Sequence, residues 1–222
     1  MILACTIAAL PSARPFLRFL NVLSVLFGGD AEHLEEDAVQ RLVEQARAGD
    51  LAARQRLYRQ HVQRVFRTVR GMLRSDAEAE DVTQDAMLTA LTSLDRYSPR
   101  SGTRFAAWLT TIAVNTTRRR FRRRRPELTA TGELPEIADP DSDIGADIDL
   151  SRQRAALLQA QAELEPRERE IVSLRYGSDL NATEIAAQVG MEAANVRKIL
   201  ERARTRLGER IEALVKSRGV AA

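Results

Sequence analysis

The apolar residues of the chain follow a helical period from Asp37 onward. They recur every three or four positions over residues 38–46 and again over residues 51–73. Gly49 and Asp50 separate the two runs, and this pair is typical of a helix end followed by a new N-cap. The pattern therefore predicts two consecutive helices. The arginines on the other sides of the second helix are interpreted as a solvated face rather than as DNA contacts: Arg54, Arg56, Arg59, Arg64, Arg67 and Arg70.

Ser75 followed by Glu78 has the spacing of a capping box, which predicts a third helix from about Asp76. Four residues at intervals of four form its inward face: Val82, Ala86, Ala90 and Leu94. Another set falls on the outward side: Asp81, Gln84, Asp85 and Leu88. The helix dipole favours acidic residues in the first turn, but it does not account for the last three of this set, which lie further in.

Pro99 and Gly102 mark a turn-rich loop over residues 97–103. Thr103, at the end of this loop, can cap a fourth helix. The inner face of that helix includes Trp108, and at this spacing the indole is predicted to be a core residue rather than a surface that stacks on a base.

Past Asn115 the apolar face of the fourth helix fades. Seven of the eight residues from 118 to 125 are arginine, with Phe121 between them. Such a helix end suits a phosphate backbone, because each Lys or Arg contact releases counterions. A targeting signal or an unstructured basic tail is the alternative, but neither explains why a helix leads straight into the run.

The next segment, residues 126–150, contains eight acidic residues, no basic residue, three prolines and two glycines. No apolar period survives there, and the composition predicts an extended or disordered linker. The net charge of +3 thus understates how strongly basic and acidic residues are segregated. This segregation indicates a polyanionic partner.

The C-terminal part has the pattern of a helix-turn-helix. Pro166 suits the first turn of a helix that ends at Gly177, and Asn181 with Glu184 forms a capping box for a short helix. Gly190 makes the turn, and a long helix is predicted from about Ala193 to Leu207. The second helix of such a motif enters the major groove. Four outward residues on it are candidates for DNA contact: Asn195, Arg197, Lys198 and Arg202.

The composition argues against several classes of protein. Cys5 is the only cysteine, so neither an intrachain disulfide nor a cysteine-based metal cluster can form. The two histidines lie far apart, and a metal site is not expected; His61 is predicted to lie at a helix surface or boundary. No glycine-rich phosphate loop or nucleophile–base arrangement is present, which argues against an enzyme and against a cofactor.

Residues 1–29 are apolar and almost uncharged. A secretory signal would begin with basic residues, but here Arg14 and Arg18 follow the apolar start. A membrane span needs about 20 apolar residues, whereas residues 16–27 supply twelve, with Arg18 and Asn21 among them. Stable membrane insertion is therefore not expected. Three interpretations stay open: a short helix that docks on the body or a partner, a poorly ordered extension, or translation that starts further in.

The motif AEDVTQDAMLTAL, followed by FAAWLTTIAVN and the basic helix end, resembles the second conserved region of bacterial sigma factors of the extracytoplasmic-function class. That match extends over residues 38–125. The C-terminal part resembles the fourth conserved region of the same family. Two departures stand out. TTRRR occupies residues 116–120, where the family often has an acidic residue, and Glu192 and Asn195 stand where Ser or Thr often opens the last helix.

The resemblance implies roles for individual residues. It implies that the outward set of the third helix binds the clamp helices of the largest polymerase subunit: Asp81, Gln84, Asp85 and Leu88. Four loop residues match the pocket that holds a base flipped from the non-template strand: Tyr97, Ser98, Arg100 and Thr103. The helix that reads and melts the minus-ten element is matched by Asn115, Arg118, Arg119 and Arg122. The fourth region implies that the last helix reads the minus-thirty-five element, and that the acidic linker threads toward the RNA exit path.

We therefore expect an all-α protein of two small helical domains joined by a flexible acidic linker. The expected division is an N-terminal extension over residues 1–36, a polymerase and minus-ten domain over 37–125, the linker over 126–150 and the helix-turn-helix domain over 151–222. The expected function is promoter-directed transcription initiation in the cytoplasm with core RNA polymerase and promoter DNA as partners; an anti-sigma factor is left open. The alternative is a helix-turn-helix regulator that binds duplex DNA without polymerase and dimerises through its first half.

Overall fold

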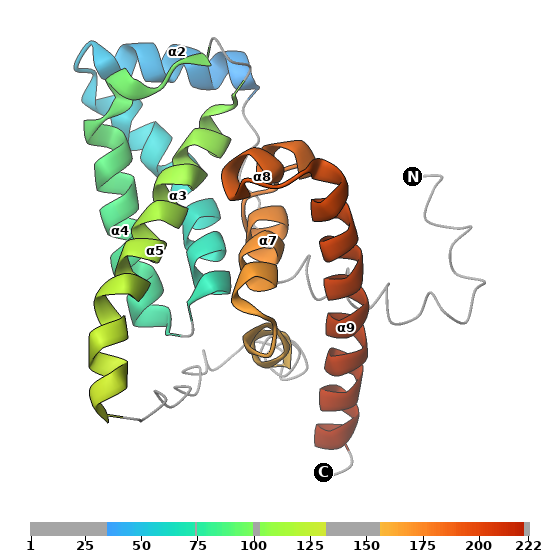
Figure 1. Cartoon of the computed structure of the whole chain (residues 1–222). Helices are drawn as coiled ribbons and strands as arrows, with labels where there is room; N and C mark the ends of the chain where they lie inside the picture. Colours follow the sequence, from blue (N-terminus) through green and yellow to red (C-terminus); the bar gives the residue numbers. More distant parts are fainter. Residues whose placement is uncertain (1–34, 74, 100–102, 132–155, 220–222) are drawn as a thin grey trace.

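The computed structural model describes residues 35–73, 75–99, 103–131 and 156–219, and the regular elements in these ranges are all helical (Figure 1). This confirms the all-α class. Residues 1–34, which include most of the expected N-terminal extension, lie outside the described ranges. None of the described helices has the length and apolar character needed to cross a membrane.

The first two helices are separated as predicted. Helix α2 spans Glu36–Arg47 and helix α3 spans Leu51–Met72. Gly49 adopts a φ of 96°, which favours glycine, and the Asp50 carboxylate accepts hydrogen bonds from the backbone N–H groups of Ala52 and Ala53 at 2.8 and 3.2 Å. The chain therefore turns at this point, and Asp50 caps the N-terminus of α3.

Helix α4 spans Asp76–Thr92, the short 3-10 turn η3 spans Leu94–Arg96, and helix α5 spans Phe105–Thr131. Ser75 caps α4 by accepting a hydrogen bond from the Glu78 N–H at 3.4 Å, as predicted. Together α2, α3, η3, α4 and α5 form the N-terminal bundle, around a core of apolar side chains that includes Leu57, Val65, Met87, Phe105 and Leu109.

The C-terminal bundle consists of a helical turn over residues 156–162 and the helices α7, Pro166–Gly177, α8, Ala182–Val189, and α9, Ala193–Gly219. Pro166 begins α7, both halves of the Asn181/Glu184 capping box are present, and Gly190 ends α8 with a left-handed φ of 66°. The predicted helix-turn-helix is thus formed by α8 and α9.

Two helices are longer than predicted. Helix α5 continues past Pro126, where the linker was expected to begin, although a proline inside a helix removes one backbone donor and crowds the carbonyl four residues before it. The rest of the expected linker lies outside the described residues. Helix α9 continues past Leu207 because Ile211 and Leu214 extend its buried stripe at helical spacing.

Two expectations about α3 were wrong. His61 is 4% exposed rather than at the surface, and its ring packs edge-on against Phe105 with the centroids 5.1 Å apart. The arginines of α3 do not form one solvated face either. Burial lowers the pKa of Arg64 and of Arg67, and Arg70 pairs with Asp76. Arg56 and Arg59 remain exposed, so the arginines of α3 are divided between solvent and the packed sides of the helix, which the sequence pattern alone did not reveal.

The two bundles pack against each other. In Figure 1 α7 lies beside the C-terminal half of α3, and the contact between these two helices is extensive. A shared apolar cluster joins Met72, Ala107 and Val114 of the N-terminal bundle to side chains of α7, α8 and α9, among them Ile171 and Ile185. Burial of this cluster from water stabilises a single closed body.

Candidate polymerase and promoter interfaces

The outward face of α4 carries the four residues expected there. Asp81, Gln84, Asp85 and Leu88 are all exposed, with Leu88 65% exposed, while Val82, Ala86 and Ala90 of the same helix are buried. The face presents carboxylates, an amide and one large apolar side chain. Exposed leucine among acidic groups is suited to a protein partner rather than to DNA, whose phosphates would repel the carboxylates.

The predicted base-capture loop is only partly described. Ser98 and Thr103 are exposed, and Arg100 lies outside the described residues. Tyr97, by contrast, is 3% exposed, and its ring packs edge-on against Phe105 with centroids 5.2 Å apart. Its hydroxyl donates to the Thr103 carbonyl at 3.2 Å. The tyrosine thus holds the two ends of the loop together and offers no ring face to a base.

Charged groups from α2 support the same loop. The Glu36 carboxylate accepts a hydrogen bond from the Phe105 N–H at 2.8 Å and therefore caps α5. Arg104, whose carbonyl accepts from the Trp108 N–H at 3.1 Å, holds the position before the helix that was expected for Thr103. Arg47 donates to the carbonyl of Leu94 at 2.7 Å and to that of Tyr97. Burial, and next the charge of Glu36, raise the pKa of Tyr97 to about 12. Sequence spacing gave no sign of these contacts because they join residues about 50 to 70 positions apart.

The basic end of α5 has two sides in the structure. Asn115, Arg119 and Arg122 are exposed, as a track for a nucleic-acid backbone requires. Arg118 instead turns toward α7 and pairs with Glu170. The four residues expected to act together are therefore divided between solvent and the C-terminal bundle.

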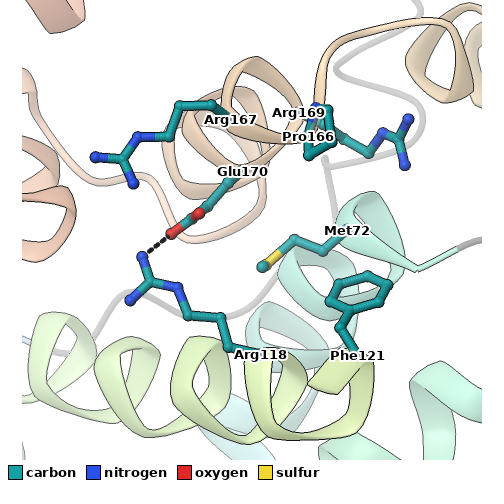
Figure 2. Close-up of a pocket in the computed structure, with 7 residues that line it drawn as sticks. All are labelled: Met72, Arg118, Phe121, Pro166, Arg167, Arg169 and Glu170. Atoms are coloured by element: carbon teal, nitrogen blue, oxygen red, sulfur yellow. Dashed lines mark hydrogen bonds and ion pairs between the residues drawn. The ribbon is translucent and has the colours of Figure 1, made fainter. Parts of the chain in front are cut away.

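A cavity of about 330 Å³ lies between α5 and α7 (Figure 2). It is lined by Met72, Arg118, Phe121, Pro166, Arg167, Arg169 and Glu170. Its arginines are already engaged: Arg118 with Glu170, Arg167 with the Val189 carbonyl, and Arg169 with carbonyls at the end of the preceding helical turn. What remains is an apolar recess beside Phe121, which is 45% exposed.

The recognition helix presents the expected residues to solvent. Asn195, Arg197, Lys198 and Arg202 are exposed on α9, whereas Val196, Ala203 and Leu207 are buried against the rest of the C-terminal bundle. Three of the exposed residues are cationic and one is an amide, the side-chain types that bond phosphates and base edges. The N-terminal half of α9 is therefore free to enter a groove of DNA.

Sequence reasoning missed the polar contacts between the bundles. Arg104 makes a bidentate ion pair with Glu184, with both N···O distances 2.8 Å. Burial opposes ionisation of Glu184, but the hydrogen bonds from Arg104 and from the Asn181 N–H outweigh it and lower the pKa of this carboxyl. No local pattern pointed to these contacts, because they join residues 52 to 81 positions apart.

The chain combines an acidic, leucine-bearing helix face, a helix that ends in arginines and a helix-turn-helix. Together these features define a helical initiation factor of bacterial transcription. Residues 57–127 match the model of sigma-70 region 2, and residues 160–209 match that of sigma-70 region 4. The chain belongs to the sigma-70 family of RNA polymerase sigma factors, in its extracytoplasmic-function class. This family is not a class of enzymes, and membership favours the initiation-factor expectation over the regulator that acts without polymerase.

Several curated relatives carry the same assignment. RNA polymerase sigma factor CarQ of Myxococcus xanthus is 36% identical over 171 residues, which cover 75% of this chain and 96% of the relative. RNA polymerase sigma-E factor of Streptomyces antibioticus is 29% identical over 165 residues, with coverages of 74% and 87%. ECF RNA polymerase sigma factor BldN of Streptomyces coelicolor is 32% identical over 166 residues, and the chain spans 62% of its length.

Solved structures share the fold. The sigma factor RpoE in complex with the anti-sigma factor NepR from Bartonella quintana has a TM-score of 0.60 at 22% identity, covering 71% of this chain and 96% of that one. CnrH in complex with the cytosolic domain of CnrY has a TM-score of 0.56 at 25% identity, covering 79% and 98%. At such low identity the first of these matches speaks for the fold alone.

Proposed function

We propose that the chain binds core RNA polymerase through the outward face of α4, captures the minus-ten element with the loop and basic helix end of the N-terminal bundle, and reads the minus-thirty-five element with α9. The single observation that supports this most strongly is the exposure of all four outward residues of α4 in a helix whose other faces are buried. A dimerising regulator has no need for this face followed by an arginine track.

The role that we propose for the loop over residues 97–103 differs in one respect from the role that the sequence resemblance implied. Because Tyr97 is buried and bonded to Thr103, we assign base capture to the exposed Ser98 and Thr103 and treat Tyr97 as the residue that positions them. A flipped base needs hydroxyl and backbone groups for its edge, and both residues supply them. Asn115, Arg119 and Arg122 then follow along α5 as the track for the extruded strand.

The C-terminal bundle contributes specificity. Residues near the N-terminal end of a recognition helix reach base edges, while those further along tend to reach phosphates. Asn195, Arg197 and Lys198 are therefore assigned to bases and Arg202 to the backbone. No catalytic step is needed, because the energy of base capture and strand binding can offset the few kcal/mol that each flipped base costs.

The site of action follows from the partners: polymerase and chromosomal promoters place this activity in the cytoplasm. An anti-sigma factor is included as a further partner, since both structural neighbours described above were solved as complexes, RpoE with the anti-sigma factor NepR and CnrH with CnrY. Such a partner would compete for surfaces that the polymerase and the promoter use.

The test is run-off transcription with purified core polymerase, this protein and a genomic promoter library, with and without residues 1–29. We expect specific start sites only when the protein is present. The truncated form shows whether the N-terminal segment inhibits, assists or has no effect. Sequence-specific binding to duplex DNA by the protein alone, without initiation in either form, would favour the regulator instead.

A further inference from the structure

The outermost side of α9 carries a carboxylate. Val196, Ala203 and Leu207 are buried against the rest of the C-terminal bundle. Four exposed residues follow one another at helical spacing on the opposite side of α9: Ala194, Lys198, Glu201 and Thr205. In Figure 1 α9 lies at the edge of the molecule, with α7 and α8 on its inner side. Glu201 therefore lies near the middle of the side of α9 that faces away from the protein.

Cationic residues flank Glu201 along the helix. Arg197 and Lys198 lie one turn before it, Arg202 follows it directly, and Arg204 lies one turn after it. Among the residues that the structure describes, none of these cations lies within ion-pair distance of the Glu201 carboxylate. The backbone carbonyl of Glu201 accepts a hydrogen bond from the Thr205 hydroxyl at 3.2 Å, but the carboxylate takes no part in it. A local ion pair therefore does not account for a carboxylate at this position.

A carboxylate on this side of α9 is unfavourable for binding to the phosphate backbone, because both carry negative charge. The proposed function places the N-terminal half of α9 in a major groove, between two rows of phosphates. There Glu201 is repelled unless it accepts a hydrogen bond from a base. The hydrogen-bond donors of the major groove are the N4 amino group of cytosine and the N6 amino group of adenine. The carboxylate therefore restricts which bases can face this position.

Cytosine suits Glu201 better than adenine does. Adenine presents its N6 amino group beside N7, an acceptor that repels a carboxylate, whereas the N4 amino group is the polar group that cytosine presents in the major groove. In a C·G pair the O6 and N7 acceptors of guanine lie next to this amino group, and they suit a cation such as Lys198 or Arg197. A carboxylate and a cation one helical turn apart therefore match the two halves of a C·G pair.

Ala194 allows the close approach that such a contact requires. It is exposed two turns before Glu201 on the same side of α9, and its side chain ends at Cβ, so it does not hold the helix away from the floor of the groove. A rise of about 1.5 Å per residue places Glu201 about 10 Å further along the helix. This distance corresponds to about three base-pair steps of roughly 3.4 Å each. Glu201 therefore lies in the part of a recognition helix whose side chains reach base edges.

We propose that Glu201 is a specificity-determining residue of α9, which selects a cytosine in the minus-thirty-five element by accepting a hydrogen bond from its N4 amino group. This inference rests on the proposed function. Guanine or thymine at the same position presents acceptors or a methyl group, and leaves the carboxylate desolvated without a donor, which is costly. Glu201 therefore contributes to specificity by rejecting wrong bases as well as by binding the right one.

The test is a selection with holoenzyme assembled from core polymerase and the full chain. A promoter found in the run-off experiment is randomised over its upstream element, and the DNA that the holoenzyme binds is sequenced. The wild type is compared with Glu201→Gln and Glu201→Ala. Glu209→Gln is the matched control, since it removes the same charge at an exposed position about two turns further along α9. Circular dichroism of each protein verifies folding.

We expect the wild type to enrich cytosine about tenfold over guanine or thymine at one position of the upstream element, a ratio in the usual range for one mismatched base pair. Glu201→Gln should prefer adenine at that position, because an amide bonds both N6 and N7 of adenine. Glu201→Ala should show a preference of about twofold or less there, because it offers no hydrogen bond. The preferences at all other positions, and those of Glu209→Gln, should match the wild type.

An equal rise in binding to every sequence in both Glu201 variants would overturn the proposal, since the carboxylate would then only repel phosphates. An unchanged cytosine preference in Glu201→Ala would overturn it as well, as would the absence of a cytosine preference in the wild type. In each of these cases, initiation that depends on the upstream element would still support the proposed function. If the wild type supports no initiation with core polymerase, the proposed function fails and the assigned base contact fails with it.

Discussion

Arg104 and Glu184 form a bidentate ion pair across the two bundles although 80 positions separate them in the chain. Arg104 precedes α5 at the end of the predicted base-capture loop, and Glu184 lies in the first turn of α8. The same carboxylate accepts a hydrogen bond from the Asn181 N–H at 2.9 Å and so caps α8. One side chain therefore takes part both in the helix-turn-helix and in the closed arrangement.

Reversing the charge of Arg104 should weaken closure. We expect Arg104→Glu to lower energy transfer between dyes on Asp95→Cys and Thr205→Cys, two exposed positions on the two bundles, in the free protein with a Cys5→Ser background. The cost should be about 1 kcal/mol because the pair is partly exposed to solvent. Adding Glu184→Arg should restore part of the transfer by re-forming the pair with opposite polarity. Glu184→Arg also removes the α8 cap, so recovery is judged by transfer and not by melting temperature. No recovery in the double variant would show that the pair does not contribute to closure.

A rescue experiment addresses Gly71 of α3, which lies against Ser173 of α7. Gly71→Ala should reduce closure, because the new methyl group overlaps the Ser173 hydroxyl. Removing that hydroxyl with Ser173→Ala leaves the Ser173 Cβ position 3.1 Å away, a tight contact that a small shift of the neighbour can relieve. Energy transfer in Gly71→Ala/Ser173→Ala should therefore exceed that in Gly71→Ala alone. Ser173→Ala by itself is the control, and equal transfer in the single and double glycine variants would contradict the proposed geometry.

The polymerase face can be tested by charge reversal. Asp85→Lys and Asp81→Lys should each weaken binding to core polymerase about tenfold or more, because a rim charge of the wrong sign faces the partner. Helicity and melting temperature should change little, since both side chains are exposed. Glu44→Lys makes the same change of charge at an exposed position on α2 and should bind normally. If the Asp85→Lys protein binds core polymerase with wild-type affinity, the outward face of α4 is not part of the interface.

Base readout by α9 should depend on residues at its N-terminal end. Arg197→Ala and Lys198→Ala should each cost about 1–3 kcal/mol at the upstream element, and transcription should then differ less between natural and scrambled elements. Arg210→Ala removes the same charge further along α9, where the side chain pairs with Glu163 at 2.7 Å. A retained preference in Arg197→Ala/Lys198→Ala, relative to this control, would assign specificity to other residues.

Tyr97 gives a prediction about alkaline pH. Its folded pKa of about 12 lies above the ordinary value of 10.0, so the neutral phenol is favoured in the folded state. This stabilisation is complete below about pH 10 and is lost as the pH rises toward 12. The melting temperature of the wild type should therefore fall more steeply over that interval than that of Tyr97→Phe. Parallel curves would mean that the phenol ionises equally in the folded and unfolded chains.

Much of the fold followed from local patterns. The turn at Gly49, the caps at Asp50 and Ser75, the Asn181/Glu184 box and the outward set of α4 all involve residues within a few positions of one another. Helical period and capping chemistry act at that range, so sequence alone was sufficient for these features. The exposed residues of α9 were predicted for the same reason.

The contacts that sequence did not predict are those between distant segments. Tyr97 was expected in a base pocket but packs on Phe105, and His61 was expected at a surface but is buried by the same ring. Arg118 belonged to a continuous basic run, yet it is turned toward Glu170 because α7 faces α5 across the cavity at that point. Which side of a helix is covered depends on tertiary packing, and no local pattern encodes it.

The exposure of the α4 face in the closed body has a kinetic consequence. Encounter between this protein and the polymerase does not depend on whether the bundles are together or apart, so the association rate should be nearly the same for the wild type and for Arg104→Glu. Any effect of the contact between the bundles on affinity should appear instead in the dissociation rate. On this basis, a change at this contact alters the lifetime of the complex and leaves the frequency of collisions that form it unchanged.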